Sequence, residues 1–287
     1  MAHTYASVAD ANEYMVSAGS TTFVSENAAI VARKLGILES VSRVIDAKME
    51  RSEFGSGFGP RTATNRYDGS GGSVLRLRDD LLSVTSITIR PSTASATTST
   101  PTVDTDYYGL DENDGYGTPY RKILLHGQGT ITAFGSGRRV TDVAGSWGYA
   151  DERYTSTTTV ASGLASDAAV TTFTTSASPT IAVGHTLLIG TEQLYVTGLA
   201  STTATVVRGA NGTTAAVHAN SSAIAVYRYP RQVVDVALRL YLRRWKAKDA
   251  GADGSDGGGG MPGVSPQEGE DTIIRRGLFG FRLKEMV

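Results

Sequence analysis

Apolar residues cover most sides of a helix predicted at residues 230–248, whose sequence is PRQVVDVALRLYLRRWKAK. With successive residues placed about 100° apart, most of its polar side chains share one narrow stripe. This stripe consists of Gln232, Asp235, Arg239, Arg243 and Lys246. The surface helix of a monomer usually has a single apolar face of about 100° or somewhat more. We therefore expect this helix to lie at the centre of a core, or to be shared between its own core and a neighbouring subunit.

Three further helices are predicted near the start of the chain. Ser7 and Asp10 have the spacing of a capping box, which marks the beginning of a short helix. Ser25 is a suitable cap for a second helix, and Gly36 is a suitable end for it. Apolar residues then recur at helical spacing over residues 37–52, which predicts a third helix. Together with the 230–248 helix, these segments predict a helical bundle.

From about Thr64 the apolar residues alternate with polar ones, which is typical of strands. Strands are predicted in the segments VLRLRDDLLSVTSITIRP and GRRVTDVAGSWGYA. Between them lies a turn-rich hairpin followed by a strand, DYYGLDENDGYGTPYRKILLHG. We expect these segments to form one small antiparallel sheet.

Residues 155–228 have a different composition from both flanks. From Thr155 to Tyr227 the charged residues are Asp167, Glu192 and Arg208, and most of the rest are Thr, Ser, Ala, Gly and Val. Short apolar runs are separated by Gly or Asn-Gly turn signals, which predicts a compact all-β module. A disordered Thr/Ser linker is the alternative, and it fits residues 155–159 best. The predicted fold class is therefore α+β, a helical bundle with a small antiparallel region and an inserted all-β domain.

The C-terminal part of the chain has the composition of a tether followed by an anchor. Residues 251–271 are Gly-rich and predict a flexible linker, and residues 272–287 form an apolar tail. The tail carries apolar and basic residues that could fill pockets on a partner: Ile273, Ile274, Arg275, Arg276, Leu278, Phe279 and Phe281. The tail could dock on another protein or fold back on its own core, and both possibilities are open.

The composition offers little to catalysis. The chain has 287 residues, a net charge of −1, no Cys, and four His without the spacing of metal ligands. We expect no metal site, no cofactor and no enzymatic activity. We also expect neither a secretory signal nor a membrane span, because no apolar run approaches the required length of about 18 residues.

Two groups of charged residues could still carry chemistry. The carboxylates could pair for glycoside hydrolysis or bind a cation, although Asp more often caps backbone amides in turns. These carboxylates are Asp79, Asp80, Asp111, Glu112 and Asp114. Arg138 and Arg139 could contact phosphate, although a basic run without clustered aromatic residues is usually a solvated face.

Several segments, in order, resemble the head-to-tail connector (adaptor, or head completion) proteins of tailed bacteriophages. They are YASVADANEYM, IDAKMERSEFGSGF, YDGSGGSVLRL, DLLSVTSITI, DYYG, PYRKILL and VAGSWGYA, followed by a helix that begins Pro-x-x-Val. The match covers residues 1–150 and 230–250 as an adaptor core, with 155–228 as an insertion. In the family, the strand that ends in Trp-Gly-Tyr runs almost directly into the helix that begins with proline. Here the β module separates Ala150 from Pro230.

The resemblance implies a structural virion protein in the neck of a phage, assembled in the host cytoplasm. It implies a homo-oligomeric ring of about twelve copies, in keeping with the cyclic symmetry of most oligomers. The portal protein would lie above the ring and a stopper or tail protein below it. Double-stranded DNA would pass through the lumen without sequence specificity. On this view the tail residues dock on the portal, and the long helix supplies a subunit interface of Val233, Val236, Leu240, Tyr241 and Trp245.

Two other functions are compatible with the sequence. One is another neck or tail component, such as a tail terminator or a protein associated with the tail tube. The other is a glycan-binding protein that uses the β module. The module offers few aromatic residues and acids for a glycan site, namely Phe173, Tyr195 and Tyr227 with Asp167 and Glu192.

Overall fold

The computed structural model describes residues 3–18, 27–51, 57–92, 98–103, 105–108, 119–164, 168–178, 180–250, 269–278 and 280. Contacts divide these residues into two compact units, which are described separately. The barrel unit comprises the described residues of Met1–Glu50 and Glu152–Arg282, and the sheet unit those of Arg51–Asp151.

The barrel unit begins with α1 (Val8–Ser17) and α2 (Ala28–Lys48). The predicted capping box at α1 is confirmed, because the Ser7 hydroxyl accepts from the Asp10 amide at 3.1 Å and the Ser7 amide donates to the Asp10 carboxylate at 2.7 Å. The predicted break at Gly36 is wrong, since α2 continues through it. Gly36 is exposed, and a glycine inside a helix costs about 1 kcal/mol, which tertiary packing outweighs.

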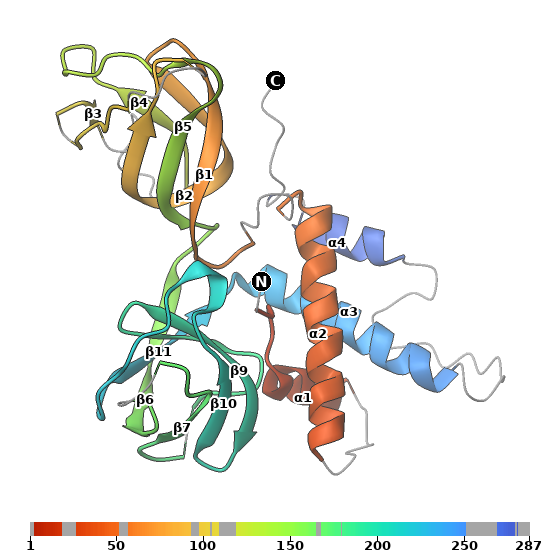
Figure 1. The fold of residues 1–287 in the computed structure, drawn as a ribbon. Helices are drawn as coiled ribbons and strands as arrows, with labels where there is room; N and C mark the ends of the chain where they lie inside the picture. Colours follow the sequence, from red (N-terminus) through yellow and green to blue (C-terminus); the bar gives the residue numbers. More distant parts are fainter. Residues whose placement is uncertain are drawn as a thin grey trace. The chain divides into compact units, whose positions relative to one another are not determined.

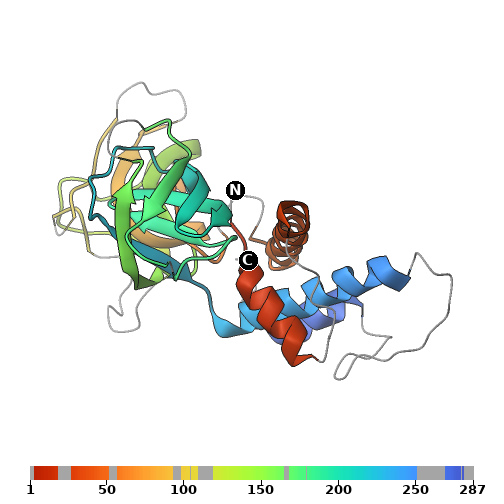
Figure 2. The same ribbon diagram turned by 90° about the horizontal axis from the view of Figure 1, so that it is seen from below.

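The helix predicted at residues 230–248 is α3 (Arg231–Ala250), and α4 (Glu270–Leu278) follows it. α3 packs against α1, α2 and α4 of its own chain (Figures 1 and 2). Three helices therefore cover its apolar sides, as expected for the central helix of a core. The buried residues of α3 are Val233, Val236, Ala237, Leu238, Leu240, Tyr241 and Leu242.

Six strands of the barrel unit form a closed antiparallel barrel in the order β10-β7-β6-β11-β8-β9. They are β6 (Glu152–Ser162), β7 (Thr172–Thr175), β8 (Thr186–Ile189), β9 (Glu192–Ala200), β10 (Thr203–Val207) and β11 (Ala223–Arg228). A short 3-10 helix, η1 (Ala210–Gly212), follows β10. The interior is filled by Val, Leu, Ile and Phe side chains, among them Phe173, Leu194 and Ile224. Residues 155–159 belong to β6, so the alternative of a disordered linker there is wrong.

The barrel shares a hydrophobic core with the helices. Val183, Tyr195 and Ala210 from the barrel side pack in one cluster with residues of α1, α2 and α3. The Val8 amide donates to the Val183 carbonyl at 2.9 Å, which joins the start of α1 to the segment before β8. Gly184 is required beside it, because it has φ +95° and a Cβ there would lie 2.8 Å from the Thr4 hydroxyl. Contacts therefore group the 155–228 module with the helices.

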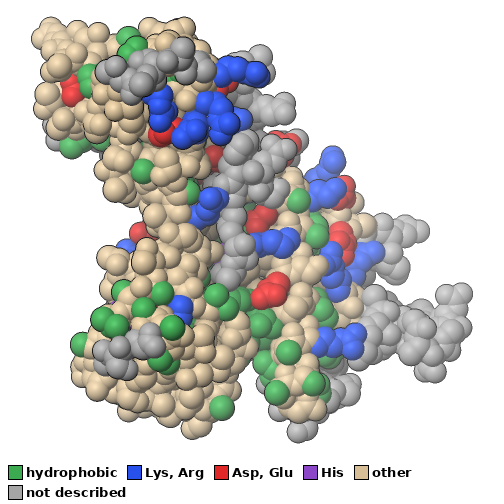
Figure 3. All heavy atoms as spheres, in the orientation of Figure 1, with side chains coloured by type: hydrophobic (Ala, Val, Ile, Leu, Met, Phe, Trp, Pro, Cys, Tyr) green, Lys and Arg blue, Asp and Glu red, His purple; other side chains and the backbone are tan. Residues whose placement is uncertain are grey.

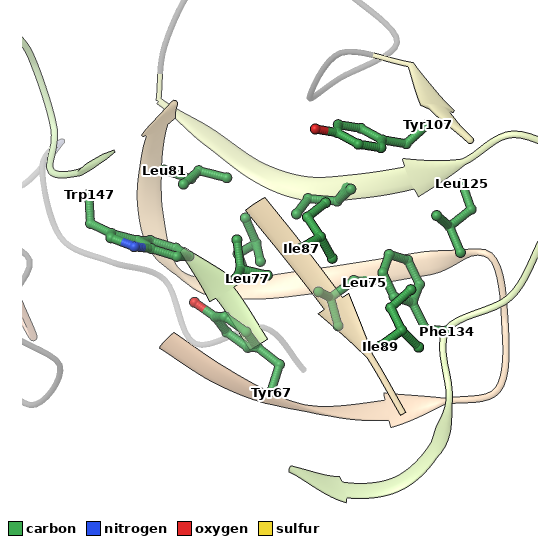
Figure 4. Packing of buried hydrophobic residues seen from close by; sticks show 12 residues of the cluster. Tyr67, Leu75, Leu77, Leu81, Ile87, Ile89, Tyr107, Leu125, Phe134 and Trp147 are labelled. Atoms are coloured by element: carbon green, nitrogen blue, oxygen red, sulfur yellow. The ribbon is translucent and has the colours of Figure 1, made fainter. Parts of the chain in front are cut away.

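The sheet unit contains five antiparallel strands in the order β1-β5-β2-β4-β3. They are β1 (Arg61–Ser70), β2 (Val74–Ile89), β3 (Tyr107–Tyr108), β4 (Tyr120–Leu125) and β5 (Ser136–Trp147). The first half of β2 pairs with β4 and its second half with β5, so one long strand serves both sides of the sheet. Figure 4 shows the core between the strands, where Trp147, Tyr67, Leu77 and Ile87 lie together.

The prediction of a helical bundle with minor β regions is wrong. Of the described residues, strands account for 39% and helices for 27%. The helical spacing was interpreted correctly in α1 and α3, but periodicity does not reveal what an apolar face packs against. In the structure, part of that face covers the barrel, through residues such as Leu38 of α2 and Tyr195 of β9. The helices are thus a layer against a β-barrel.

Candidate functional site

The predicted subunit-interface residues on α3 are mostly buried within their own chain. Val233, Val236, Leu240 and Tyr241 are each at most 2% exposed. The fifth residue, Trp245, is partly buried and stacks on the Tyr241 ring with centroids 6.0 Å apart. A neighbouring subunit could reach the first four only by displacing helices of this chain. Trp245 is therefore the member of the set that a partner could contact directly.

The side chains of Arg33 and Lys34 lie over the Trp245 ring, at 5.9 and 5.8 Å from its centroid. Such contacts stabilise each cation by about 0.5–1 kcal/mol at exposed sites. The Lys34 ammonium also donates to the Asn12 side chain at 2.6 Å, which fixes the position of its cation. The end of α3 thus presents an aromatic ring that has two cations of α2 close to it.

Three of the predicted docking residues lie in α4 and are buried in their own unit. Ile273, Ile274 and Leu278 are 6%, 0% and 0% exposed, whereas Arg275 and Arg276 are exposed. Phe279 and Phe281 lie outside the described residues. Of the two possibilities left open by the sequence, the structure has this part of the tail packed on its own core.

Ion pairs hold α4 on the helical layer. The Arg244 guanidinium donates to both carboxylate oxygens of Glu270, at 2.8 and 2.9 Å, and Lys48 pairs with Asp271 at 2.8 Å. The hydrogen bond from Arg244 lowers the pKa of Glu270, and that from Lys48 lowers the pKa of Asp271. Gly277 lies against α3, where a Cβ would be 2.4 Å from the Val236 side chain. The fit of α4 thus depends on charge at its first turn and on a glycine near its end.

The candidate carboxylates of the sheet unit are structural. Asp79 and Asp80 lie inside β2 and not in a turn, so the turn explanation is wrong for them. The fully buried Asp80 accepts from Arg51 at 2.6 Å and from Arg121 at 2.8 Å, while Asp79 accepts from the Asn65 amide at 3.1 Å. Asp111, Glu112 and Asp114 lie outside the described residues. Two adjacent acids in an apolar strand were the only sequence signal for this buried pair.

A second buried carboxylate organises the barrel. Glu192 accepts from the Arg208 guanidinium at 2.7 and 2.8 Å, from the Gly209 and Ala216 amides, and from His218. Burial favours a raised pKa, but these donors outweigh it and lower the pKa of Glu192 to about 2. The pair was detectable in the sequence as the only Glu and the only Arg between Thr155 and Tyr227.

A third buried group joins the start of the chain to α2. Asp46 accepts from the Tyr5 hydroxyl and from Arg43 at 3.0 Å, with the His3 ring nitrogen at 3.6 Å. Burial lowers the pKa of His3, which favours its neutral form. In each of these three groups a carboxylate is neutralised by partners in its own unit, which is typical of structural ion pairs.

The remaining candidate features give no reaction centre in the described part of the chain. Arg138 and Arg139 are exposed, and the Arg139 amide donates to Asp68 at 2.8 Å. The described residues contain no group of His, Cys, Asp and Glu that could hold a metal ion. Among these residues, none of the helices has the length and apolar character needed to cross a membrane.

Comparison with known proteins gives no further guide, because no protein family, curated protein or solved structure matches the chain.

Proposed function

We propose that this chain is a structural adaptor of a tailed-phage neck, which forms a ring beneath the portal and joins the capsid to the tail. The proposal rests on the order of segments that resemble the connector family. The structural observation that supports it most strongly is the place where the barrel joins the rest of the chain.

The chain enters and leaves the barrel at neighbouring positions. β6 and β11 pair in antiparallel register, with Glu152 opposite Arg228 and Arg153 opposite Tyr227. Paired Cα atoms in such a ladder are about 4.5–5.5 Å apart. Removal of the barrel would therefore leave two ends that a short peptide could join. This is the arrangement expected of an insertion into a single connection.

Without the insertion, the strand ending in Trp147, Gly148 and Tyr149 would run almost directly into the helix that begins at Pro230. That is the connection the resemblance implies for the family. The geometry at the β6–β11 junction thus supports the interpretation of a family pattern interrupted by a barrel. The buried carboxylates support a structural role, because each has its charge neutralised by a nearby cation.

In this proposal the exposed basic face of α4, with Arg275 and Arg276, contacts acidic groups of the portal. Its apolar side remains on α3, as in the structure, so α4 would dock as a preformed helix. Charges at the rim of an interface affect the association rate and register more than the affinity. DNA would pass through the ring without base-specific contacts.

The oligomeric state tests the ring. Mass photometry of the purified chain alone should give particles of about twelve times the 30.2 kDa of one chain, and heavier particles after the portal protein of the same phage is added. Electron microscopy should show these particles as rings. A chain that stays monomeric under both conditions, and is absent from purified virions by mass spectrometry, contradicts the proposal.

The double variant Arg275→Glu, Arg276→Glu tests the portal contact without disturbing the buried side of α4. We expect ring assembly to persist and the association rate with portal to fall at least about tenfold. Arg231→Glu is the control, because Arg231 is also an exposed arginine on a helix but does not belong to α4. Rings of the double variant that bind portal at an unchanged rate would exclude this face of α4 as the contact.

A further inference from the structure

The barrel unit contains a cleft that the adaptor role does not use. Its volume is about 760 Å³, within the range of about 300–1,000 Å³ that is typical of small-molecule sites. The walls come from the start of α1, from β6, from the segment before β8 and from the junction of β11 with α3. All of these belong to one compact unit, so the cleft is a property of a single body.

Two side chains on the β8 side of the cleft can bind a ligand through hydrogen bonds. The His185 Nδ1 accepts from the Ala182 amide at 3.0 Å, so in the neutral ring the proton is on Nε2, which is then a donor. Burial lowers the pKa of His185, which favours this neutral form. The Thr186 side chain is 2% exposed and lies on the cleft wall, where its hydroxyl is a hydrogen-bond neighbour of the Tyr229 hydroxyl. Each of these two hydroxyls can also accept from a ligand hydroxyl.

Aromatic side chains also line the cleft. The Tyr154 hydroxyl donates to the Thr180 carbonyl at 3.3 Å, and the Arg228 guanidinium lies 4.4 Å from the centroid of its ring. Tyr229 meets the Tyr5 ring edge-on, with centroids 5.0 Å apart. Burial raises the pKa of Tyr154, and raises that of Tyr229 to about 12. Both hydroxyls are therefore protonated and neutral at physiological pH.

The charged groups of the cleft balance one another. Asp10 and Glu152 provide two carboxylates, and Arg228 and Arg231 provide two guanidinium groups. A phosphate or another strong anion would face the two carboxylates, and a polycation would face the two arginines. A ligand with many hydroxyl groups and no net charge can use both, because each hydroxyl donates to a carboxylate and accepts from a guanidinium.

We propose that this cleft binds a neutral saccharide of about two sugar rings, a size that its volume can contain. Thr186 and His185 contact the sugar hydroxyls from one side, and Asp10, Glu152 and Arg228 contact them from the others. The Tyr154 ring, with the Arg228 guanidinium over it, forms part of the cleft wall. Of the glycan-site candidates named from sequence, Tyr227 lines this cleft, whereas Phe173, Tyr195 and Glu192 are buried in the barrel or in its contact with the helices. The proposal is independent of the adaptor role.

The test is saturation-transfer NMR and calorimetry on the full chain with four neutral disaccharides: maltose, cellobiose, lactose and N,N′-diacetylchitobiose. We expect at least one to bind with a Kd of about 1 mM or below. Thr186→Val keeps the shape and removes the hydroxyl, and Arg228→Gln alters an exposed side chain, so neither should affect folding. Each of these two variants should weaken binding about tenfold.

Thr157→Val is the control. Thr157 is at an exposed position of β6 and is not among the cleft-lining residues, so this variant should leave binding unchanged.

Three results would overturn the proposal. The first is that none of the four disaccharides binds at about 10 mM, well above the expected Kd. The second is saccharide binding that neither Thr186→Val nor Arg228→Gln weakens, which would place the ligand elsewhere. The third is binding of inorganic phosphate in place of any sugar, with loss of that binding in Arg228→Gln, which would make the cleft an anion site.

Discussion

The barrel of β6–β11 and the sheet of β1–β5 are both antiparallel, but they differ in whether their strands have free edges. In the barrel every strand has a neighbour on each side, because β9 pairs with both β8 and β10. The sheet ends in β1 on one side and the two-residue β3 on the other. A free edge exposes backbone groups that can pair with another chain, and proteins often protect such edges with charged side chains.

The barrel and the edge strand of the sheet also differ in their number of charged residues. From Thr155 to Tyr227 the sequence contains three charged residues, whereas the edge strand β1 alone contains Arg61, Arg66 and Asp68. Figure 3 shows Lys and Arg side chains gathered on the visible face of the sheet unit and few on that of the barrel. Because the barrel is closed, its strands have no free edge, and a sequence of mostly Thr, Ser, Ala and Val can form them without charged side chains that protect an edge. The four predictions below test this comparison, with a separate spectroscopic reporter for each unit.

The largest effect is expected for the buried ion pair of the sheet. Asp80→Asn removes the carboxylate charge that pairs with the fully buried Arg51 guanidinium, which should cost about 3–5 kcal/mol of unfolding free energy. Trp147 lies in the core of the sheet unit and Trp245 in the barrel unit, so fluorescence of a Trp245→Phe background reports the sheet alone. Urea unfolding should show a shifted sheet transition. Asp68→Asn, at an exposed position of β1, should change it by less than about 1 kcal/mol.

Acid should weaken the barrel through Glu192. The pKa of this buried carboxylate is lowered from 4.5 to about 2 in the folded state, so its stabilisation is complete above pH 4.5 and is lost as the pH falls toward 2. The shift corresponds to about 3 kcal/mol. Fluorescence of a Trp147→Phe background should follow the barrel unit. Glu192→Gln should be less stable at neutral pH and should lose this part of the pH dependence; an unchanged dependence would contradict the assignment.

A smaller effect should show that the barrel also depends on the helices. The Tyr195 hydroxyl donates to Glu39 of α2 at 2.9 Å. Tyr195→Phe should lower the unfolding free energy of the barrel unit by about 1 kcal/mol, the usual net value of one hydrogen bond. Tyr154→Phe removes a longer hydrogen bond within the barrel, of 3.3 Å, and serves as the control. Equal small changes in both variants would argue against a specific bond to α2.

The smallest effect on stability concerns the open edge. Arg66 pairs with Asp142 at 2.5 Å on the surface of the sheet, so Arg66→Thr should cost less than about 1 kcal/mol. The same change removes a charge from edge strand β1 and should increase self-association, measured by light scattering against protein concentration. Thr157→Ala on the closed strand β6 should not. If Arg66→Thr stays as soluble as the parent chain, charge does not protect this edge.

The features predicted correctly from sequence are those determined by neighbours in the chain. The capping box of Ser7 and Asp10 involves residues three apart, and the helix after Pro230 is defined by its own polar stripe. The strands of the 155–228 module were likewise marked by local turn signals. Such patterns can be recognised in the sequence because the residues that interact are only a few positions apart in the chain.

The features that were missed depend on distant partners. Gly36 continues a helix because packing across α2 outweighs its low propensity, and Asp80 is buried in a strand because Arg51 and Arg121 reach it. The cleft residues His185, Thr186 and Tyr154 come from different parts of the chain and have no shared spacing. Local periodicity shows that a helix has an apolar face, but it does not show which element that face packs against. The sequence therefore predicted a helical bundle, whereas the helices pack as a layer on a barrel.

The pairing of β6 with β11 also determines how the barrel should respond to mechanical tension. A pull along the chain acts on Glu152 and Arg228, which are the first and last residues of the barrel and lie opposite each other. The hydrogen bonds of the ladder are then loaded one after another, as in a zipper, and not all together in shear. The barrel should therefore open at low force from this junction.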